Sequence, residues 1–298
     1  MQWCGCAGIE RVAFDADSLG LPRGAMTLVR DLVHERTGLY YEESRLDTLA
    51  DRLAPLVAAR GLGSFLDYYY LLKYDAAGTG EWHQVHDALS VPETYFWREL
   101  DQLRAVADIL VPELAARLTR PIRIWCVPCA TGEEPLTVAM LLDMAGWFQR
   151  APIELRASDA SPALLDAARK GRFRERAFRA LPPDVRERYF TPAGDRWQIS
   201  DTLLARVHSW TRVNLMNLDE VAPYAMADII LCRNVFIYFS DSAIRRVVDA
   251  FADRMPEPGY LCVGASESLL RITERFDLQR IGEAFVYVKP ADTKDARR

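Results

Sequence analysis

The stretch IWCVPCATGEEP, residues Ile124 to Pro135, decides the fold class because it joins an apolar strand to a helix through a turn of small residues. Pro135 suits the first helical position, and the apolar run Leu136 to Leu142 continues the helix, so free backbone N–H groups face the turn. This order is typical of the cofactor site of a doubly wound α/β domain. We therefore predict an α/β fold with a cofactor at this turn.

Two acidic residues, Glu133 and Glu134, begin the helix that leaves this turn. Acids at a helix start also simply complement the helix dipole. Phosphate-binding turns, however, place Lys, Ser or Thr here, so the two carboxylates favour a cofactor that carries a cationic group. S-adenosylmethionine (SAM), with its ammonium and sulfonium groups, fits this requirement.

Strands and helices alternate on both sides of this stretch, which predicts a mostly parallel sheet with right-handed crossovers. The expected strands are Ile122–Cys126, Ile153–Ala157, Asp228–Cys232, Tyr260–Val263, Phe276–Arg280 and Ala284–Val288. Residues from about 173 to 212 break the alternation. There, Arg196–Ile199 and Arg206–Trp210 alternate as short strands, and we expect them to form an inserted antiparallel β-subdomain.

The amino-terminal part of the chain has helical periodicity, with Leu and aromatic repeats punctuated by Gly, and predicts a small all-α domain. The expected organisation is a flexible lead (1–23), a helical domain (24–90), a linker segment and helix (91–120), the α/β domain (121–290, with the insertion at about 173–212) and a tail (291–298).

Composition limits the function classes. The chain has 298 residues, 50% of them hydrophobic, and a net charge of −5, which does not favour a nucleic-acid partner. No apolar run reaches the roughly 18 residues of a membrane span and no signal peptide is evident, so we expect a cytoplasmic protein, and a monomer. The six cysteines are few and scattered, which predicts free thiols. Cys4 and Cys6 could join Cys126 and Cys129 around zinc, but the expected metal content is none.

Four features are predicted at the carboxyl ends of strands, where such sheets bind ligands. They are the turn Pro128–Gly132, Asp159, the pair Asn214-Leu215 and the pair Arg233-Asn234. Asp159 lies where an acid can accept ribose hydroxyls, but it could equally be a helix N-cap, and Asn214 could be a turn residue. A fifth cluster lies at Ser90–Glu99, where Thr94 and Arg98 are four apart and are expected to share a helix face.

Four motifs together resemble one family. They are TYFWRE (94–99), TGEEP (131–135), CRNVFIYF (232–239) and GASESL (264–269). The chain resembles the chemotaxis-receptor protein-glutamate O-methyltransferase family (CheR type) from about Met26 to Pro290. The resemblance implies an all-α domain followed by a class I SAM-dependent methyltransferase domain with a Rossmann-like sheet. It also implies SAM as donor, S-adenosylhomocysteine (SAH) as product and a receptor glutamate as acceptor.

The resemblance also implies roles for single residues. Carried over position by position, together with the turn glycine, the expected cofactor-binding residues are Thr94, Arg98, Gly132, Glu134, Asp159, Asn214, Leu215, Arg233 and Asn234. Arg98 and Tyr238 are expected near the transferred methyl group as catalytic residues. A glutamate acceptor is already ionised at neutral pH, so the reaction needs no general base.

The implied partners are the cytoplasmic helices of chemoreceptors. Some family members dock a tethering peptide through a glycine-rich loop, but the segment Tyr189–Trp197 is short here, which favours a tether-independent enzyme. Arg45, Arg52 and Arg60 recur along one expected helix and could form a receptor-facing basic surface or a solvated one. Three positions depart from the family pattern: Pro92 for Asn, Pro128 for Gly and Ala265 for His, so cofactor binding is expected to be weaker or shifted.

Two other functions start from the same residues. The pentapeptide WCVPC (125–129) matches the thioredoxin redox motif, which suggests a thiol-disulfide oxidoreductase using Cys126 and Cys129. Alternatively, the departures at Pro92 and Pro128 could leave a non-catalytic protein that still binds a receptor or the cofactor. The predicted function remains glutamate methylation on chemoreceptors.

Overall fold

The computed structural model describes residues 23–290, which fall into two compact units. One contains residues 23–33 and 41–89, and the other contains residues 34–40 and 90–290. Residues 34–40 thus group with the second unit, although the sequence places them in the helical domain. The predicted lead and tail lie almost wholly outside the described residues. Within those residues, no helix combines the length and apolarity needed to cross a bilayer.

The helical unit is built on amphipathic helices. Their bounds are α1 (Arg23–Thr37), whose last residues group with the second unit, α2 (Leu46–Ala59), α3 (Phe65–Tyr74) and α4 (Gly78–Leu89). In α2, Leu49, Leu53 and Val57 recur every four residues and are fully buried, so one stripe of the helix enters the core. Ser64 caps α3 by accepting a hydrogen bond from the backbone N–H of Asp67.

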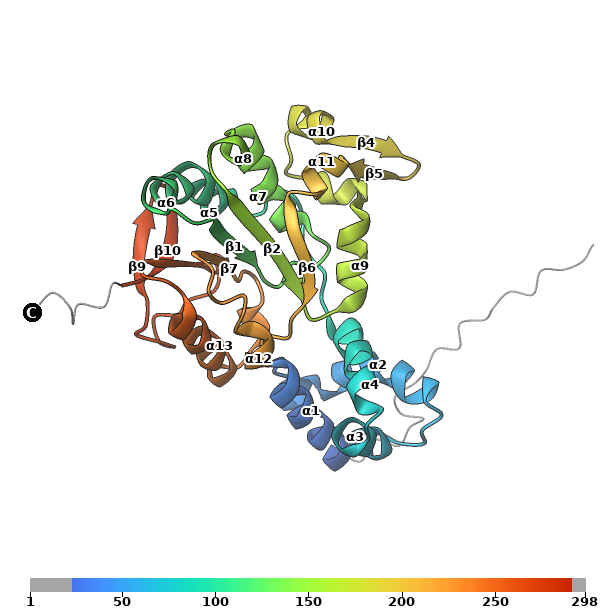
Figure 1. The fold of residues 1–298 in the computed structure, drawn as a ribbon. Helices are drawn as coiled ribbons and strands as arrows, with labels where there is room; N and C mark the ends of the chain where they lie inside the picture. The colour runs from blue at the N-terminus through green and yellow to red at the C-terminus, as the bar shows by residue number, and fades with distance from the viewer. Residues whose placement is uncertain (1–22, 291–298) are drawn as a thin grey trace, which may run out of the picture. The chain divides into compact units, whose positions relative to one another are not determined.

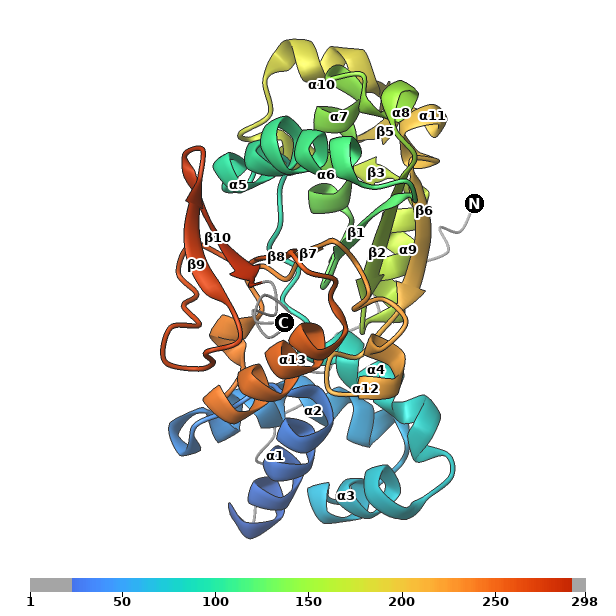
Figure 2. The same ribbon diagram turned by 60° about the vertical axis from the view of Figure 1, so that its left-hand side comes forward.

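The second unit is a seven-stranded sheet with helices on both faces (Figures 1 and 2). Its strand order is β6-β2-β1-β7-β8-β10-β9, with the first five strands parallel and the last two antiparallel. These strands are β1 (Ile122–Cys126), β2 (Ile153–Asp159), β6 (Val207–Arg212), β7 (Ile229–Leu231), β8 (Gly259–Cys262), β9 (Asp277–Ile281) and β10 (Ala284–Lys289). The α/β class and the mixed sheet are as the sequence predicts.

Alternation along β1 divides the core between the two faces of the sheet. Ile124 and Cys126 pack into one cluster with the helices α5 to α9, whereas Trp125 and Val127 pack into the other with α12 and α13. Figure 2 shows the two helical layers on opposite sides of the strands. The helices are α5 (Leu100–Ala105), continued by η3 (Val106–Leu110) and α6 (Val111–Arg117), then α7 (Glu133–Met144), α8 (Trp147–Arg150), α9 (Pro162–Lys170), α12 (Leu218–Val221) and α13 (Asp241–Arg254).

A small antiparallel sheet, ordered β3-β5-β4, is inserted after α9. It contains β3 (Arg172–Phe173), β4 (Phe190–Ala193) and β5 (Arg196–Ile199), with η4 (Glu175–Phe178), α10 (Pro183–Tyr189) and α11 (Asp201–Leu204) around it. The assignment of residues 206–210 to this insertion is wrong. That segment belongs to β6, which pairs in parallel with β2 in the main sheet. Alternation of apolar and polar residues predicts a strand, but it does not show which other strand it pairs with.

Candidate active site

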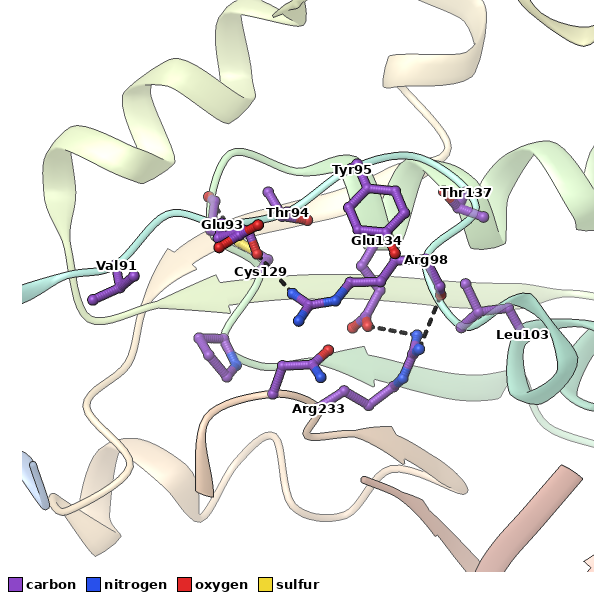
Figure 3. A pocket seen from close by; sticks show the side chains of 13 residues that line it. Val91, Glu93, Thr94, Tyr95, Arg98, Leu103, Cys129, Glu134, Thr137 and Arg233 are labelled. Carbon is purple, nitrogen blue, oxygen red and sulfur yellow. Dashed lines mark hydrogen bonds and ion pairs between the residues drawn. The ribbon is translucent and has the colours of Figure 1, made fainter. Parts of the chain in front are cut away.

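A cavity of about 60 Å³ lies beside the carboxyl ends of β1 and β7 (Figure 3). Parallel strands of an open sheet place ligands at this edge. The lining residues come from three segments: Val91, Glu93, Thr94, Tyr95, Arg98 and Leu103; Pro128, Cys129, Ala130, Glu134 and Thr137; and Arg233 and Asn234.

The turn after β1 has two residues in the left-handed region, Ala130 (φ +46°) and Gly132 (φ +97°). A Cβ atom at Gly132 would lie 3.1 Å from both the Ala168 Cβ and a Trp210 ring carbon, so glycine is required for space as well as for conformation. Helix α7 begins at Glu133, two residues before the predicted start. Pro135 is therefore its third residue, still within the first turn, where an N–H group has no intrahelical partner.

Asp159 ties this turn to the end of β2. Its Oδ2 accepts a hydrogen bond from the Ala130 N–H at 2.9 Å, and its Oδ1 accepts one from the Ser161 N–H at 2.9 Å. Ser161, not Asp159, caps α9, because its hydroxyl accepts from the Leu164 N–H. Asp159 does not itself line the cavity, but it fixes the conformation of the turn that does.

Arg233 and Glu134 form a buried ion pair at the back of the cavity. The Arg233 side chain is 1% exposed, and its Nη1 donates to Glu134 Oε2 at 2.9 Å (Figure 3). Glu134 Oε1 and Arg233 Nε are both buried and have no hydrogen-bond partner among the described residues. Burial raises the pKa of Glu134 to about 7, although Arg233 opposes the shift. The carboxylate therefore has one oxygen available to a cationic ligand.

Glu99, which the sequence analysis did not single out, joins three parts of the site. Its carboxylate accepts hydrogen bonds from Arg233 Nη2 at 3.1 Å, Asn234 Nδ2 at 3.0 Å and the Ala265 N–H at 2.9 Å. Burial opposes ionisation, but the hydrogen bonds from Asn234, Ala265 and Arg233 hold the pKa of Glu99 below its ordinary value. Glu99 thus remains an anion and fixes the orientation of Arg233 and Asn234.

Glu267 is a second carboxylate whose role was missed, although it lies within the GASESL motif. It accepts the backbone N–H groups of Asn234, Gly264 and Ile237 at 2.8, 2.6 and 3.2 Å. Asn234 has a positive φ of 59°. Glu267 therefore stabilises an unusual backbone conformation in the turn that presents Arg233 and Asn234 to the cavity.

The prediction that Thr94 and Arg98 share a helix face is wrong. Residues 91–99 form an irregular segment with positive φ angles at Trp97 (67°) and Glu99 (48°), and α5 begins only at Leu100. Both residues still line the cavity. The Arg98 side chain is oriented by a hydrogen bond from its Nη1 to the Glu93 carbonyl oxygen at 2.6 Å (Figure 3).

The remaining predicted residues lie elsewhere in the same unit. Asn214 uses its amide within the chain, accepting from the Met216 N–H and donating to the distant Arg36 carbonyl, and Leu215 is buried in the apolar core. Tyr238 lies on a short 3₁₀ turn and is 38% exposed. None of the three lines the cavity. Of the departures from the family pattern, Pro128 lines the cavity and Pro92 is exposed.

The cysteines of the WCVPC motif do not resemble a redox pair. Cys126 and Cys129 are free thiols that are at most 1% exposed, and burial raises the pKa of each well above the ordinary value. A reactive redox cysteine needs access and a lowered pKa, so this arrangement argues against the oxidoreductase alternative. Within residues 23–290, no cluster of three or more metal-ligating side chains occurs. Cys4 and Cys6 lie outside the described residues.

Comparisons with known proteins cover nearly the same range as the two units. The family model for the CheR methyltransferase all-alpha domain matches residues 25–90, and that for the CheR methyltransferase SAM binding domain matches residues 92–285. The chain is 34% identical to chemotaxis protein methyltransferase 2 of Vibrio cholerae, over 88% of this chain and 91% of that protein. It is 27% identical to chemotaxis protein methyltransferase 1 of Pseudomonas aeruginosa, over 87% and 96%.

Among solved structures, the rRNA methyltransferase AviRa of Streptomyces viridochromogenes aligns with a TM-score of 0.40 at 14% identity, over 70% of this chain and 91% of that one. The two family models together match the chain almost from end to end of its described part. The chain belongs to the CheR methyltransferase family.

Proposed function

We propose that this SAM-dependent methyltransferase esterifies glutamate side chains on the cytoplasmic helices of a chemoreceptor. The observation that carries the proposal is the cavity at the strand ends, which joins an anion with a free oxygen, Glu134, to a cation, Arg98. The free Glu134 oxygen suits an ammonium group, which fits SAM. The chemotaxis methyltransferases at 27–34% identity support the receptor as the class of acceptor.

Some residues of the site would bind the cofactor directly, and others would hold those binding residues in position. Glu134 would bind the cofactor's ammonium group, and Thr94 and Asn234 would contact the same end of it. Asp159 would meet the ribose hydroxyls while holding the turn at Ala130. Asn214 and Leu215 would meet the adenine, and Gly132 keeps the turn packed against Ala168 and Trp210. Arg233 is fully buried and keeps Glu134 in place.

When bound, SAM supplies an electrophilic methyl group. The acceptor carboxylate is ionised at neutral pH, so this chain has to orient and desolvate it rather than remove a proton. Arg98 is 26% exposed at the cavity and is the cation that would orient the carboxylate. Tyr238 follows the Arg233-Asn234 turn, and its exposed side chain would help to orient the transferred methyl group towards the acceptor.

We further propose that receptor contact does not use a tethering peptide. The strands β4 and β5 are joined by a two-residue turn, Gly194-Asp195, because Ala193 pairs directly with Arg196. A hairpin this tight carries no extended loop for an additional peptide. The proposed enzyme therefore recognises its receptor by direct contact.

The experiment titrates the protein with SAH by calorimetry and then analyses receptor cytoplasmic fragments for methyl esters by mass spectrometry. We expect SAH binding and methyl esters on glutamates of at least one fragment. Arg98→Ala should lower the transfer rate at least about 100-fold while SAH still binds. SAH binding with no ester on any fragment would favour a non-catalytic binding protein, and the absence of both would favour a scaffold that has lost the cofactor.

A further inference from the structure

The proposed reaction brings together a cationic cofactor and an anionic acceptor, which make opposite demands on the site. Glu133 and Glu134 lie in the first turn of α7, and Glu99 faces Arg233 beside them. Glu134 lines the cavity, and the other two carboxylates lie next to it in the chain or against Arg233, so together they attract the cofactor's ammonium group but repel an approaching glutamate. An acceptor with several acidic residues therefore needs a positively charged surface beside the cavity.

The inserted β-subdomain has such a surface. Residues 170–179 carry five basic side chains and one acid in a chain whose net charge is −5. The acid, Glu175, already accepts hydrogen bonds from Arg186 Nη1 at 2.7 Å and Trp197 Nε1 at 2.8 Å. Arg174 and Arg176 are exposed, and their side chains have no hydrogen bond or ion pair with any residue in the range 23–290.

Packing fixes these arginines close to the cavity. Phe173, which precedes η4, and Phe178, the last residue of η4, contact the ring of Phe96, with centroids 4.8 and 5.3 Å away. The Phe96 N–H donates to the Ala177 carbonyl at 3.0 Å. Phe96 directly follows Tyr95, which lines the cavity. The inserted segment and the cavity wall are therefore anchored to each other by a buried aromatic cluster.

Arg179 extends this charge to the cavity wall. Its guanidinium lies 3.6 Å from the centroid of the Tyr95 ring and 3.7 Å from Glu93 Oε1. Arg176 lies in the 3₁₀ turn η4, and Arg179 is the C-cap residue three positions later, with helical φ and ψ, so the two side chains project from the same side. Burial raises the pKa of Glu133, and the charges of Arg176 and Arg179 partly oppose this shift. This electrostatic effect means that both arginines lie near the site.

The helix α2 offers a weaker alternative. Arg60 pairs with the buried Glu81, and Arg52 donates to the Leu89 carbonyl at 2.9 Å. Two of the three arginines in or next to α2 thus have structural partners within their own unit. The arginines around η4 that lack partners are better suited to an anionic ligand from outside the chain.

We propose that Arg174, Arg176 and Arg179, the η4 arginines, form the docking surface for the acidic receptor segment that carries the acceptor glutamate. This inference rests on the proposed function and adds the surface that recognises the acceptor. The partner is an anionic protein segment, and its contact with the η4 arginines is electrostatic and sensitive to salt.

The test uses a receptor fragment that the parent enzyme methylates and compares two double variants. Arg174→Glu/Arg176→Glu should raise KM for the fragment about tenfold with little change in kcat, since each exposed charge pair contributes modestly. Arg245→Glu/Arg246→Glu, on the exposed side of α13, is the matched control with the same change of charge and should leave KM unchanged. SAH titration of both variants checks that the fold is intact.

A second fragment, in which the acidic residues flanking the acceptor glutamate are replaced by Gln, completes the cycle. The parent should lose affinity for it, and the η4 variant should no longer distinguish the two fragments. Equal KM values for parent and η4 variant on the acidic fragment would overturn the docking surface while leaving the proposed function intact. A parent enzyme that methylates no fragment would overturn both.

Discussion

Two glutamates that pair with an arginine, one in each unit, differ in how completely their carboxylate oxygens are paired. In the helical unit, Glu81 is 1% exposed, and both oxygens have partners: Oε1 accepts from the Tyr68 hydroxyl at 2.8 Å and Oε2 from Arg60 Nε at 2.7 Å. In the methyltransferase unit, Glu134 pairs with Arg233 through one oxygen only.

The difference separates a structural carboxylate from a ligand-binding one. A folded chain seldom leaves a buried polar atom without a partner, because desolvation of that atom is not compensated. Where it does so beside a cavity, local stability is lower and a binding group is available. Glu81 is expected to matter for folding alone, and Glu134 for the cofactor.

The largest expected effect is that of removing Arg233. Arg233→Met leaves Glu134 and Glu99 without their shared cation and should lower the free energy of unfolding by about 3–5 kcal/mol. Denaturation with urea measures it. Arg212→Met, which removes a pair with Glu220 whose side chains are 33% and 24% exposed, is the control and should cost about 1 kcal/mol or less. Similar losses of unfolding free energy in the two variants would contradict the prediction that the buried Arg233 pairs contribute more to stability than an exposed pair.

Removing the charge of Glu134 should weaken cofactor binding rather than destabilise the fold. Glu134→Gln replaces a charged acceptor for the cofactor's ammonium group and should weaken SAH binding by about 1.5–3 kcal/mol, or roughly 10- to 150-fold. Calorimetry measures the dissociation constant. Unchanged SAH affinity would remove Glu134 from the proposed cofactor site.

The matching change in the helical unit should do the reverse. Arg60→Met removes one of the two hydrogen-bond partners of Glu81 and should lower the free energy of unfolding by about 1–3 kcal/mol. The loss should be smaller than that for Arg233, because the Arg60 side chain is already 43% exposed. SAH affinity should stay that of the parent. A change in affinity would show that the two carboxylates are not functionally separate.

Much of the site could be predicted because polar residues after apolar strands signal a ligand edge. That pattern gave Arg233 and Asn234, which line the cavity, and Asp159, which does not line it but holds the turn after β1. The irregular segment 91–99 could not be predicted, because positive φ angles at Trp97 and Glu99 leave no mark in residue type.

Residues that act through distant contacts were equally hidden. Glu99 meets Arg233 across 134 positions of sequence, and Glu267 meets Asn234 across 33. No local periodicity contains such a pairing. The partner of β6 escaped for the same reason, since pairing with β2 spans the whole insertion.

The smallest effect is the pH dependence of cofactor binding. The pKa of Glu134 is raised to about 7 by burial, so its charged form is mostly absent at pH 6 and mostly present at pH 8. A group with a raised folded-state pKa stabilises the fold most below its unfolded pKa, and that contribution is lost as pH rises towards 7.

Binding should follow the opposite trend, because SAH binds the charged form: affinity should rise about tenfold from pH 6 to pH 8. Calorimetry across this range tests the prediction, with Glu134→Gln as the control that should flatten the profile. A parent profile as flat as that of the variant would mean that Glu134 is already ionised at pH 6, or that its free oxygen does not meet the ammonium group. In that case Glu134 would resemble Glu81, a carboxylate whose partners all lie within the chain.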